Sequence, residues 1–200
     1  MKLLVATNNQ EKCRELRTML KGLDVDLLTL EDFPAAPEVV EDGGSFEANA
    51  RKKASEMAAY ADMHAVADDS GLCVDALDGR PGVRSARYAG PSPTREKLCR
   101  KLLGEMGGVP EDDRTAAFHC CTAFAEPDGD IIFTVHGSCP GSITREMQGQ
   151  GGFGYDPVFY YPPAGQTFAE MSAEEKNSVS HRARALEKFR DRLEDFLQAD

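Results

Sequence analysis

The stretch VADDSGLCVDALDGRPGVRSARYAG, residues 66–90, is the most informative part of the chain for both fold and function. Apolar residues lead into two adjacent acids, Asp68 and Asp69, and Ser70-Gly71 favours a turn before the next apolar run. We therefore expect two strands, with the acids at the end of the first. Because like charges repel and a packed core disfavours carboxylates, the pair indicates a site that holds a hard cation such as Mg²⁺ or activates water. An Asx-turn, in which aspartate caps backbone donors, is the alternative.

The elements on either side of this stretch predict a sheet with helices packed on it. Apolar or alternating runs predict strands at Lys2–Ala6, Val25–Leu28, Ala65–Ala67, Leu72–Ala76, Thr115–Ala125 and Ile131–Ser138. Helical spacing predicts helices after Thr7-Asn8-Asn9, after Ser45, from Ser92-Pro93 and after Ser180. Early β-α units, a hairpin at Pro127-Asp128-Gly129 and a terminal helix indicate an α/β or α+β fold. Without repeats or linkers, residues 1–200 are expected to form one domain.

Composition narrows the classes of partner. The 200 residues are 41% hydrophobic, which suits one or two compact domains. A net charge of −11 argues against nucleic acid or an anionic membrane as the main partner, because both select for basic faces. The six cysteines form no CxxC pair and no metal-like spacing with histidine. We expect reduced thiols in a cytoplasmic protein without a zinc site.

Two segments before residue 66 have residues suited to phosphate. Thr7-Asn8-Asn9-Gln10-Glu11-Lys12 joins a strand to a helix, where free backbone N–H groups and the helix dipole attract anions. An ordinary N-cap with a solvent-facing lysine is the alternative. Further along, Asn49 and Lys53 share a helical face and Glu41 precedes them in a loop, where it could complete a metal site. A solvated loop and helix flank would also explain these residues.

Three segments after the acids complete the set. Arg84 and Arg87 could neutralise the acids, touch phosphate or form structural pairs. Residues 149–157, GQGGFGYDP, contain glycines that allow close backbone approach to a ligand and leave Phe153 free to stack on a flat ring. A hairpin turn with a core phenylalanine is the alternative. His181 and Arg182 follow Ser180 in a first helical turn, where the dipole disfavours cations, so they indicate either a functional site or a surface pair.

These segments, in this order and spacing, resemble the inosine triphosphate pyrophosphatase family, also called XTP/dITP diphosphatases. The resemblance extends from Leu3 to about Leu193 and is strongest in ADDSGL, SARYAG, GGFGYDP and SHR. It implies a mixed α/β fold with an elongated central mixed sheet flanked by helices, two lobes with an active-site cleft between them, and a homodimer. It also implies Mg²⁺-dependent hydrolysis of noncanonical purine nucleoside triphosphates (ITP, dITP, XTP) to the monophosphate and pyrophosphate.

The resemblance also implies roles for individual residues. The expected metal ligands are Glu41 and Asp69, with Asp69 the base for the attacking water and Asp68 its partner carboxylate. The expected phosphate contacts are Thr7, Asn8, Asn9, Gln10, Glu11, Lys12 and Lys53. Ser70 lies against the substrate, and the residues expected at the base are Phe153, Gly154, Tyr155, Asp156, Lys176, His181 and Arg182. Asn8 and Glu11 depart from the family, which usually has glycine there, so Glu11 is expected to point outward.

The residues disfavour three alternatives to this family. The septum-site type of nucleotide pyrophosphatase has the same general fold, but GGFGYDP and SHR argue against it. A nucleotide sensor without turnover would not need Glu41, Asp68, Asp69 and Lys12 together. A cysteine-based enzyme is disfavoured because no cysteine pairs with a histidine in a motif.

Overall fold

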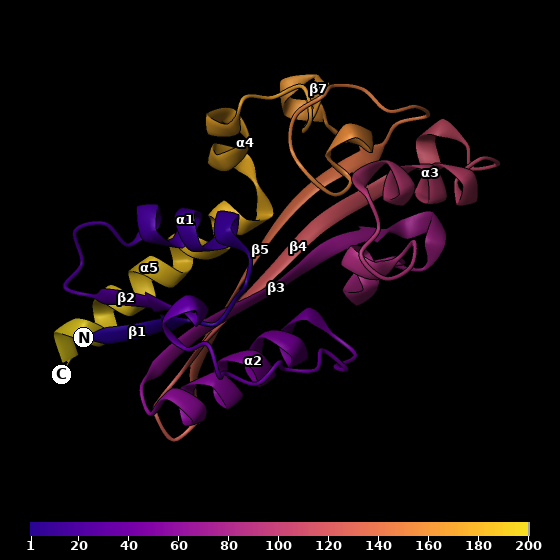
Figure 1. The fold of residues 1–200 in the computed structure, drawn as a ribbon. Helices are drawn as coiled ribbons and strands as arrows, with labels where there is room; N and C mark the ends of the chain where they lie inside the picture. The colour runs from indigo at the N-terminus through magenta and orange to yellow at the C-terminus, as the bar shows by residue number, and fades with distance from the viewer. Residues whose placement is uncertain (200) are drawn as a thin grey trace. The chain divides into compact units, whose positions relative to one another are not determined.

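The computed structural model describes residues 1–199, and over these it contains a seven-stranded sheet in the order β2-β1-β3-β4-β5-β6-β7 (Figure 1). The strands are β1 Lys2–Val5, β2 Asp26–Thr29, β3 His64–Val74, β4 Thr115–Ala125, β5 Ile131–Ile143, β6 Phe159–Tyr161 and β7 Gln166–Thr167. β1 is parallel to β2 and β3, whereas β6 is antiparallel to β5 and β7. The predicted mixed sheet is confirmed.

Five α-helices accompany the sheet in residues 1–199: α1 Gln10–Met19, α2 Phe46–Ala61, α3 Arg95–Glu105, α4 Ala173–Val179 and α5 His181–Ala199. None of them, within this described part of the chain, is both long and apolar enough to cross a membrane. The chain forms two compact units. The first contains Met1–Asp69, Cys120–Gly137 and the residues from Arg184 onward, and the second contains Ser70–His119 and Ser138–Ala183.

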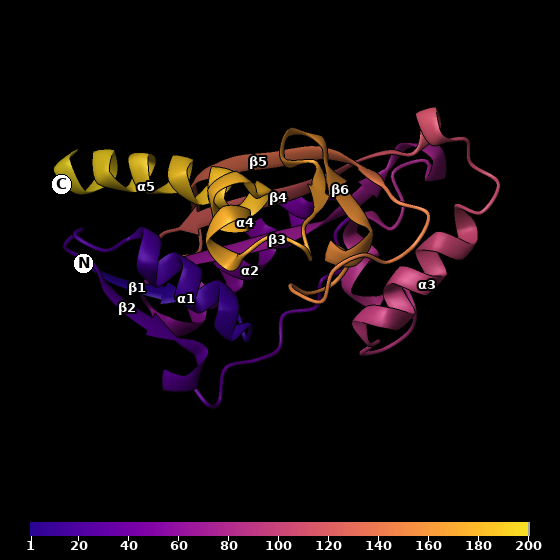
Figure 2. The ribbon, with the colours of Figure 1, turned by 90° about the horizontal axis from the view of Figure 1, so that it is seen from above.

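In the first unit, helices cover both faces of the sheet (Figures 1 and 2). Residues that alternate along a strand point to opposite faces. One face therefore packs on α1 and α5, through Leu3, Val5, Val66, Leu16, Phe189 and Leu193. The other packs on α2, through Leu4, Ala6, Ala65, Ala67, Ala50, Ala54 and Ala58. The side chains of this second contact are small, which keeps α2 close to the sheet.

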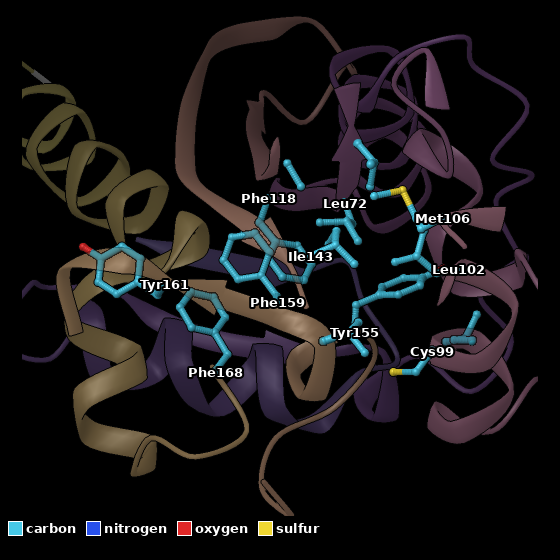
Figure 3. Close-up of a cluster of buried hydrophobic side chains, with 14 of the residues drawn as sticks. Leu72, Cys99, Leu102, Met106, Phe118, Ile143, Tyr155, Phe159, Tyr161 and Phe168 are labelled. Carbon is cyan, nitrogen blue, oxygen red and sulfur yellow. The ribbon is translucent and has the colours of Figure 1, made fainter. Parts of the chain in front are cut away.

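The second unit has its own core, drawn in Figure 3. Leu102, in the last turn of α3, and Met106, directly after its end, are fully buried there. Phe118 and Phe159 have ring centroids 4.6 Å apart, and those of Phe159 and Phe168 are 4.8 Å apart. Tyr155 joins this cluster and its hydroxyl donates to the carbonyl of Ser85 at 2.8 Å. The core thus fixes one end of the glycine-rich segment.

The local structure around the acid pair differs from the prediction. β3 runs without interruption from His64 to Val74, so Asp68 and Asp69 lie within a strand and Ser70-Gly71 does not form a turn. Strands β1 and β4 are both neighbours of β3 in the sheet, and sheet pairing overrides the weak local preference for a turn. The predicted break between two strands was therefore wrong.

Two helix predictions also need correction. α3 begins at Arg95 rather than at Ser92-Pro93, because the Thr94 hydroxyl caps the backbone N–H of Lys97 at 3.3 Å. α4 was not predicted, although Ser172 and Glu175 form a capping box at its start. The predicted cap of the last helix is confirmed, since the Ser180 hydroxyl accepts from the backbone N–H of Ala183 at 3.2 Å.

Candidate functional site

The two adjacent acids of β3 face opposite sides of the sheet in the first unit. Asp68 forms an ion pair with Lys12 of α1, at 2.7 Å. Asp69 accepts a hydrogen bond from the Asn49 amide of α2, at 2.9 Å. This follows from strand alternation, because Val66 also packs on the α1 face, whereas Ala67 packs on the α2 face. The acids are thus separately supported rather than paired with each other.

Lys12 is not the solvent-facing lysine of the alternative interpretation. Its side chain is 15% exposed and the Asp68 side chain 11% exposed. The Sγ of Cys120 also lies 3.9 Å from the Asp68 carboxylate, within range of a weak S–H donor. The segment Thr7–Lys12 therefore turns one cation inward onto β3.

Lys53 reaches the same region from α2. Its ammonium donates to the backbone carbonyl of Asp68 at 2.7 Å and to the Glu41 carboxylate at 2.5 Å. The Asp68 carbonyl is within its reach because β1 pairs with β3 only as far as Val66. Along a strand, every second carbonyl points toward the same neighbouring strand. The carbonyl of Asp68 is therefore the next one after that of Val66 to point toward the β1 side of β3. The early end of β1 creates the position that Lys53 fills.

Asp69 is 7% exposed, and its environment changes its acidity. Burial raises the pKa of the Asp69 carboxyl above its usual value, while Lys53 and the Asn49 hydrogen bond counteract part of that rise. Glu41 adds to the rise in the pKa, so the two carboxylates influence each other. A raised pKa brings the basicity of a carboxylate closer to that needed for proton abstraction near neutral pH.

Glu41 and Asp69 were predicted to hold Mg²⁺. Within residues 1–199, no group of three or more His, Cys, Asp or Glu side chains is arranged to hold a metal ion. Mg²⁺ is commonly bound through one or two carboxylates together with substrate phosphates. Two electrostatically coupled carboxylates supply that oxygen-only donor set, so the residues fit a magnesium ion that the substrate helps to hold. The metal site stays a prediction.

The remaining residues of the predicted phosphate segment cap and flank α1. The Asn9 side-chain oxygen accepts from the backbone N–H groups of Glu11 at 2.9 Å and Lys12 at 3.3 Å, which is the N-cap of the alternative interpretation. Glu11 is exposed and lies 3.8 Å from Arg14, so it points outward as expected. Gln10 donates to the carboxylate of Glu31 at 2.6 Å, and Asn8 and Thr7 precede the cap.

A second cluster lies in the second unit, around a buried aspartate. Asp156 is 2% exposed and accepts from the Lys176 ammonium at 2.5 Å and from the backbone N–H of Phe153 at 2.7 Å. Burial raises the pKa of Asp156, and Lys176, the Phe153 hydrogen bond and, most weakly, Arg95 counteract that rise. Lys176 also lies 4.1 Å from the centre of the Phe153 ring. The aspartate thus links Lys176 to the glycine-rich turn.

Close contacts require glycine in this turn, most strictly at two positions. Gly152 has a φ of +67°, and a Cβ there would lie 2.0 Å from the Asp156 carboxylate. A Cβ on Gly149 would lie 2.5 Å from the backbone of Ala169. Phe153, which follows Gly152, is 41% exposed, in contrast to the buried core phenylalanine of the alternative interpretation.

Ser70 and Arg182 extend this cluster. The Arg182 guanidinium donates to the Ser70 hydroxyl at 3.2 Å, and its carbon lies 6.0 Å from the centre of the Phe153 ring. His181 is 5% exposed and stacks on Phe118, with ring centroids 4.8 Å apart. Tyr155 also lies in the core, so its side chain supports the turn from within. Of the residues predicted at the base, His181 and Tyr155 have mainly internal contacts.

Each predicted set is thus assembled within one unit. The first unit brings together Lys12, Glu41, Lys53, Asp68 and Asp69, and the second brings together Ser70, Phe153, Asp156, Lys176 and Arg182. Arg84 and Arg87 are exposed on a short 3-10 helix, Gly82–Arg87. Sequence reasoning left Asn49 out of the site. Its shared face with Lys53 was the available signal, but its partner Asp69 became apparent only in the fold.

The chain is similar to known proteins in both sequence and fold. A model of the Ham1 family matches residues 3–192. A protein named dITP/XTP pyrophosphatase from Desulforamulus reducens is 52% identical, covering 94% of this chain and 93% of its own length. A protein of the same name from Geobacter sulfurreducens is also 52% identical, over 96% of each chain. The solved structure of a HAM1 protein from Coxiella burnetii has a TM-score of 0.92 at 37% identity, covering 98% of this chain and 99% of that one. By its sequence and its fold alike, the chain belongs to the Ham1 family.

Proposed function

We propose that the chain hydrolyses noncanonical purine nucleoside triphosphates, such as ITP, dITP and XTP, to the monophosphate and pyrophosphate. The observation that carries the proposal is the support of Asp68 and Asp69 on opposite faces of β3, with Lys12 and Lys53 beside them. Relatives about half identical over nearly the whole chain are named dITP/XTP pyrophosphatases, which supports the same activity here.

The first cluster suits the triphosphate. Lys12 and Lys53 provide two ammonium groups, and the α1 N-terminus adds backbone donors. Phosphoryl transfer needs positioning and charge neutralisation more than covalent chemistry, so these groups supply much of what the reaction requires. On binding, the lysines would exchange their carboxylate partners for phosphate oxygens, which keeps each ammonium paired.

Asp69 would accept the proton of the water that attacks the α-phosphorus. Its pKa is raised by burial, and the Asn49 amide fixes the orientation of its carboxylate. Glu41 and Asp69 would hold Mg²⁺, which supplies positive charge to the phosphates and polarises the reacting phosphorus–oxygen bonds. Asp68 would keep Lys12 in place before the phosphates arrive.

The second cluster suits the base. Phe153 offers a partly exposed ring for stacking, and Lys176 and Arg182 supply hydrogen-bond donors next to it. Inosine and xanthosine have a carbonyl at purine position 6, which accepts from donors, whereas adenosine has an amino group there. Donors facing that amino group would lose their partners, which costs about 1–3 kcal/mol for each buried mismatch. We therefore propose ITP, dITP and XTP as good substrates and ATP as a very poor one. GTP has the same carbonyl at position 6, so we propose that its 2-amino group, in place of which XTP has a carbonyl, makes it a poor substrate.

The test is to identify the products formed from ITP, XTP, GTP and ATP with Mg²⁺ and after chelation by EDTA. Pyrophosphate and the monophosphate should appear with ITP and XTP, and chelation should abolish turnover. Release of orthophosphate as the first product would contradict α-phosphorus attack. Equal hydrolysis of ATP and ITP would contradict the assignment of the base cluster.

A homodimer and a cytoplasmic location are part of the same proposal. The family resemblance supports the dimer, which light scattering after size-exclusion chromatography would test. The six cysteines are free thiols and five of them are buried, as is usual for proteins of reducing compartments. A monomer at micromolar concentration would contradict the first proposal, and secretion of the tagged chain would contradict the second.

A further inference from the structure

Arg95 holds the glycine-rich turn by its backbone. The Nη1 of Arg95 donates to three successive carbonyl oxygens, those of Gln150 at 3.1 Å, Gly151 at 2.6 Å and Gly152 at 3.2 Å. Both the arginine and the turn belong to the second unit. One guanidinium nitrogen thus meets three consecutive peptide dipoles.

Helix α3 itself gives no reason for a cation at Arg95. This arginine is the first residue of α3, directly after the Thr94 cap, where the positive end of the helix dipole disfavours a cation. The converging carbonyls explain its position better, because three oxygens that point at one place repel each other unless a cation lies between them. The left-handed backbone of Gly152, with φ +67°, helps to bring these carbonyls to one side.

The turn positions the groups assigned to the base. Phe153 follows directly after the last bound carbonyl, and its backbone N–H is held by Asp156 at 2.7 Å. Asp156 in turn holds Lys176 at 2.5 Å. Glycine has more backbone freedom than any other residue, so a segment with glycine at 149, 151, 152 and 154 would sample many conformations if Arg95 did not bind it.

We propose that Arg95 is a positioning residue that fixes the glycine-rich turn so that Phe153 is preset for stacking on the base, and thereby sets substrate affinity. The inference rests on the proposed function, since it assigns Phe153 to the base. Because Arg95 binds the turn of the base cluster, its effect should fall on KM and leave kcat at saturating substrate nearly unchanged.

The experiment compares Arg95→Ala and Arg95→Lys with Arg100→Ala as the matched control. Arg100 lies on the same helix but pairs with Glu96, at 2.6 Å on the exposed surface, and has no bond to the turn. In Arg95→Ala, the KM for ITP and the Kd for inosine monophosphate should rise about threefold to tenfold, the scale of one aromatic stacking contact. The kcat and the inhibition constant of pyrophosphate should stay within about twofold of wild type.

Two further readouts separate positioning from general damage to the fold. Hydrogen exchange of the backbone amides in residues 149–154 should accelerate in Arg95→Ala and not in Arg100→Ala. Arg95→Lys should recover most of the affinity, because an ammonium also donates to converging carbonyls. The proposal would be overturned if KM and Kd were unchanged in Arg95→Ala, or if Arg100→Ala raised them equally. A fall in the kcat of Arg95→Ala as large as the rise in its KM would also overturn it.

The two proposals fail in different ways. If the wild-type chain hydrolyses no nucleoside triphosphate, the proposed function is wrong, and the Kd for inosine monophosphate together with hydrogen exchange still decides the role of Arg95. If wild type hydrolyses ITP but exchange in the turn does not change in Arg95→Ala, the positioning role is wrong and the proposed function stands.

Discussion

Asp69 and Asp156 are both buried aspartates, yet their surroundings suit different tasks. Burial raises the pKa of each. Asp156 is bound directly by the Lys176 ammonium and by a backbone N–H. Asp69 is bound by the neutral amide of Asn49. Asp156 therefore has an ammonium group in direct contact, as suits a structural link, whereas Asp69 accepts from a neutral amide and Lys53 acts on its pKa only through its charge.

The charge of each cluster shows the same contrast. The first contains the carboxylates of Glu41, Asp68 and Asp69 and the ammonium groups of Lys12 and Lys53. In the second, Asp156 binds Lys176, Arg182 lies near the Phe153 ring and Arg95 binds the turn, so cationic donors outnumber carboxylates among these residues. Carboxylates attract a metal ion, and an excess of donors attracts a base with carbonyl groups.

The largest effect is expected from Asp69→Asn. Loss of a general base should lower kcat by about 10²–10⁴. The fold should survive, because the pKa of Asp69 is raised and its ionised form costs stability above that pKa. In metal-free buffer the variant should be at least as stable as wild type at pH 7, and this advantage should fade as the pH falls through the pKa of the folded carboxyl.

The measurements are steady-state kinetics and urea unfolding at several pH values. Near wild-type kcat in the folded variant would remove Asp69 from the chemistry. Asp69 and Asp156 would then not differ in their part in the reaction.

Removal of a phosphate lysine should have the next largest effect. Lys12→Ala or Lys53→Ala should lower kcat/KM for ITP by about 10²–10³, the scale of a lost charge-stabilising donor, without changing the ITP-to-ATP preference. Lys52→Ala is the matched control, since Lys52 lies next to Lys53 on α2 but pairs with exposed Asp42, at 2.7 Å. If the ITP preference collapsed instead, these lysines would belong to the base cluster.

Lys176→Ala tests the structural role of Asp156. It leaves a carboxylate that is 2% exposed without its ammonium partner, so unfolding free energy should fall by about 3 kcal/mol at pH 7.5. The pKa of Asp156 should rise further once the lysine is gone, so the deficit should shrink as the pH is lowered through that pKa and the carboxyl becomes neutral. Chemical unfolding at pH 7.5 and 5 measures this, and a loss independent of pH would contradict it.

The smallest effect is expected from Arg182→Ala, which removes one donor at the base. The ratio of kcat/KM for ATP to that for ITP should rise about tenfold, mainly through loss of ITP turnover. Parallel assays of both nucleotides measure it, with Lys12→Ala as the variant that should leave the ratio unchanged. Equal loss for both nucleotides would indicate that Arg182 only supports Ser70.

The sequence predicted those elements whose signals are local. The Ser45 cap, the hairpin at Pro127-Asp128-Gly129 and the Ser180 cap all appear where expected. A sheet with helices packed on it followed from the order of the elements, and its mixed character followed from the family resemblance. The turn at Ser70-Gly71 was wrong because neighbouring strands, which no local pattern reveals, extend β3 through it.

The site was predictable as a set of residues but not as a set of contacts. The resemblance named Lys12 and Asp68, yet neither it nor their spacing indicated that they form an ion pair across α1 and β3. Asn49 and Arg95 were missed as supports because their partners, Asp69 and the carbonyls of residues 150–152, are distant in the sequence. Three-dimensional proximity decides such roles.

Because Asp68 and Asp69 point to opposite faces of β3, the number of residues in this strand matters for the site as much as their types do. Deletion or insertion of one residue in this strand before Asp68 would exchange the two acids between α1 and α2. Lys12 would then meet the carboxylate that belongs with Asn49, although every side chain of the site would still be present. We therefore expect many conservative substitutions at the packing positions of β3 to retain activity, while single-residue insertions and deletions between His64 and Ala67 abolish it.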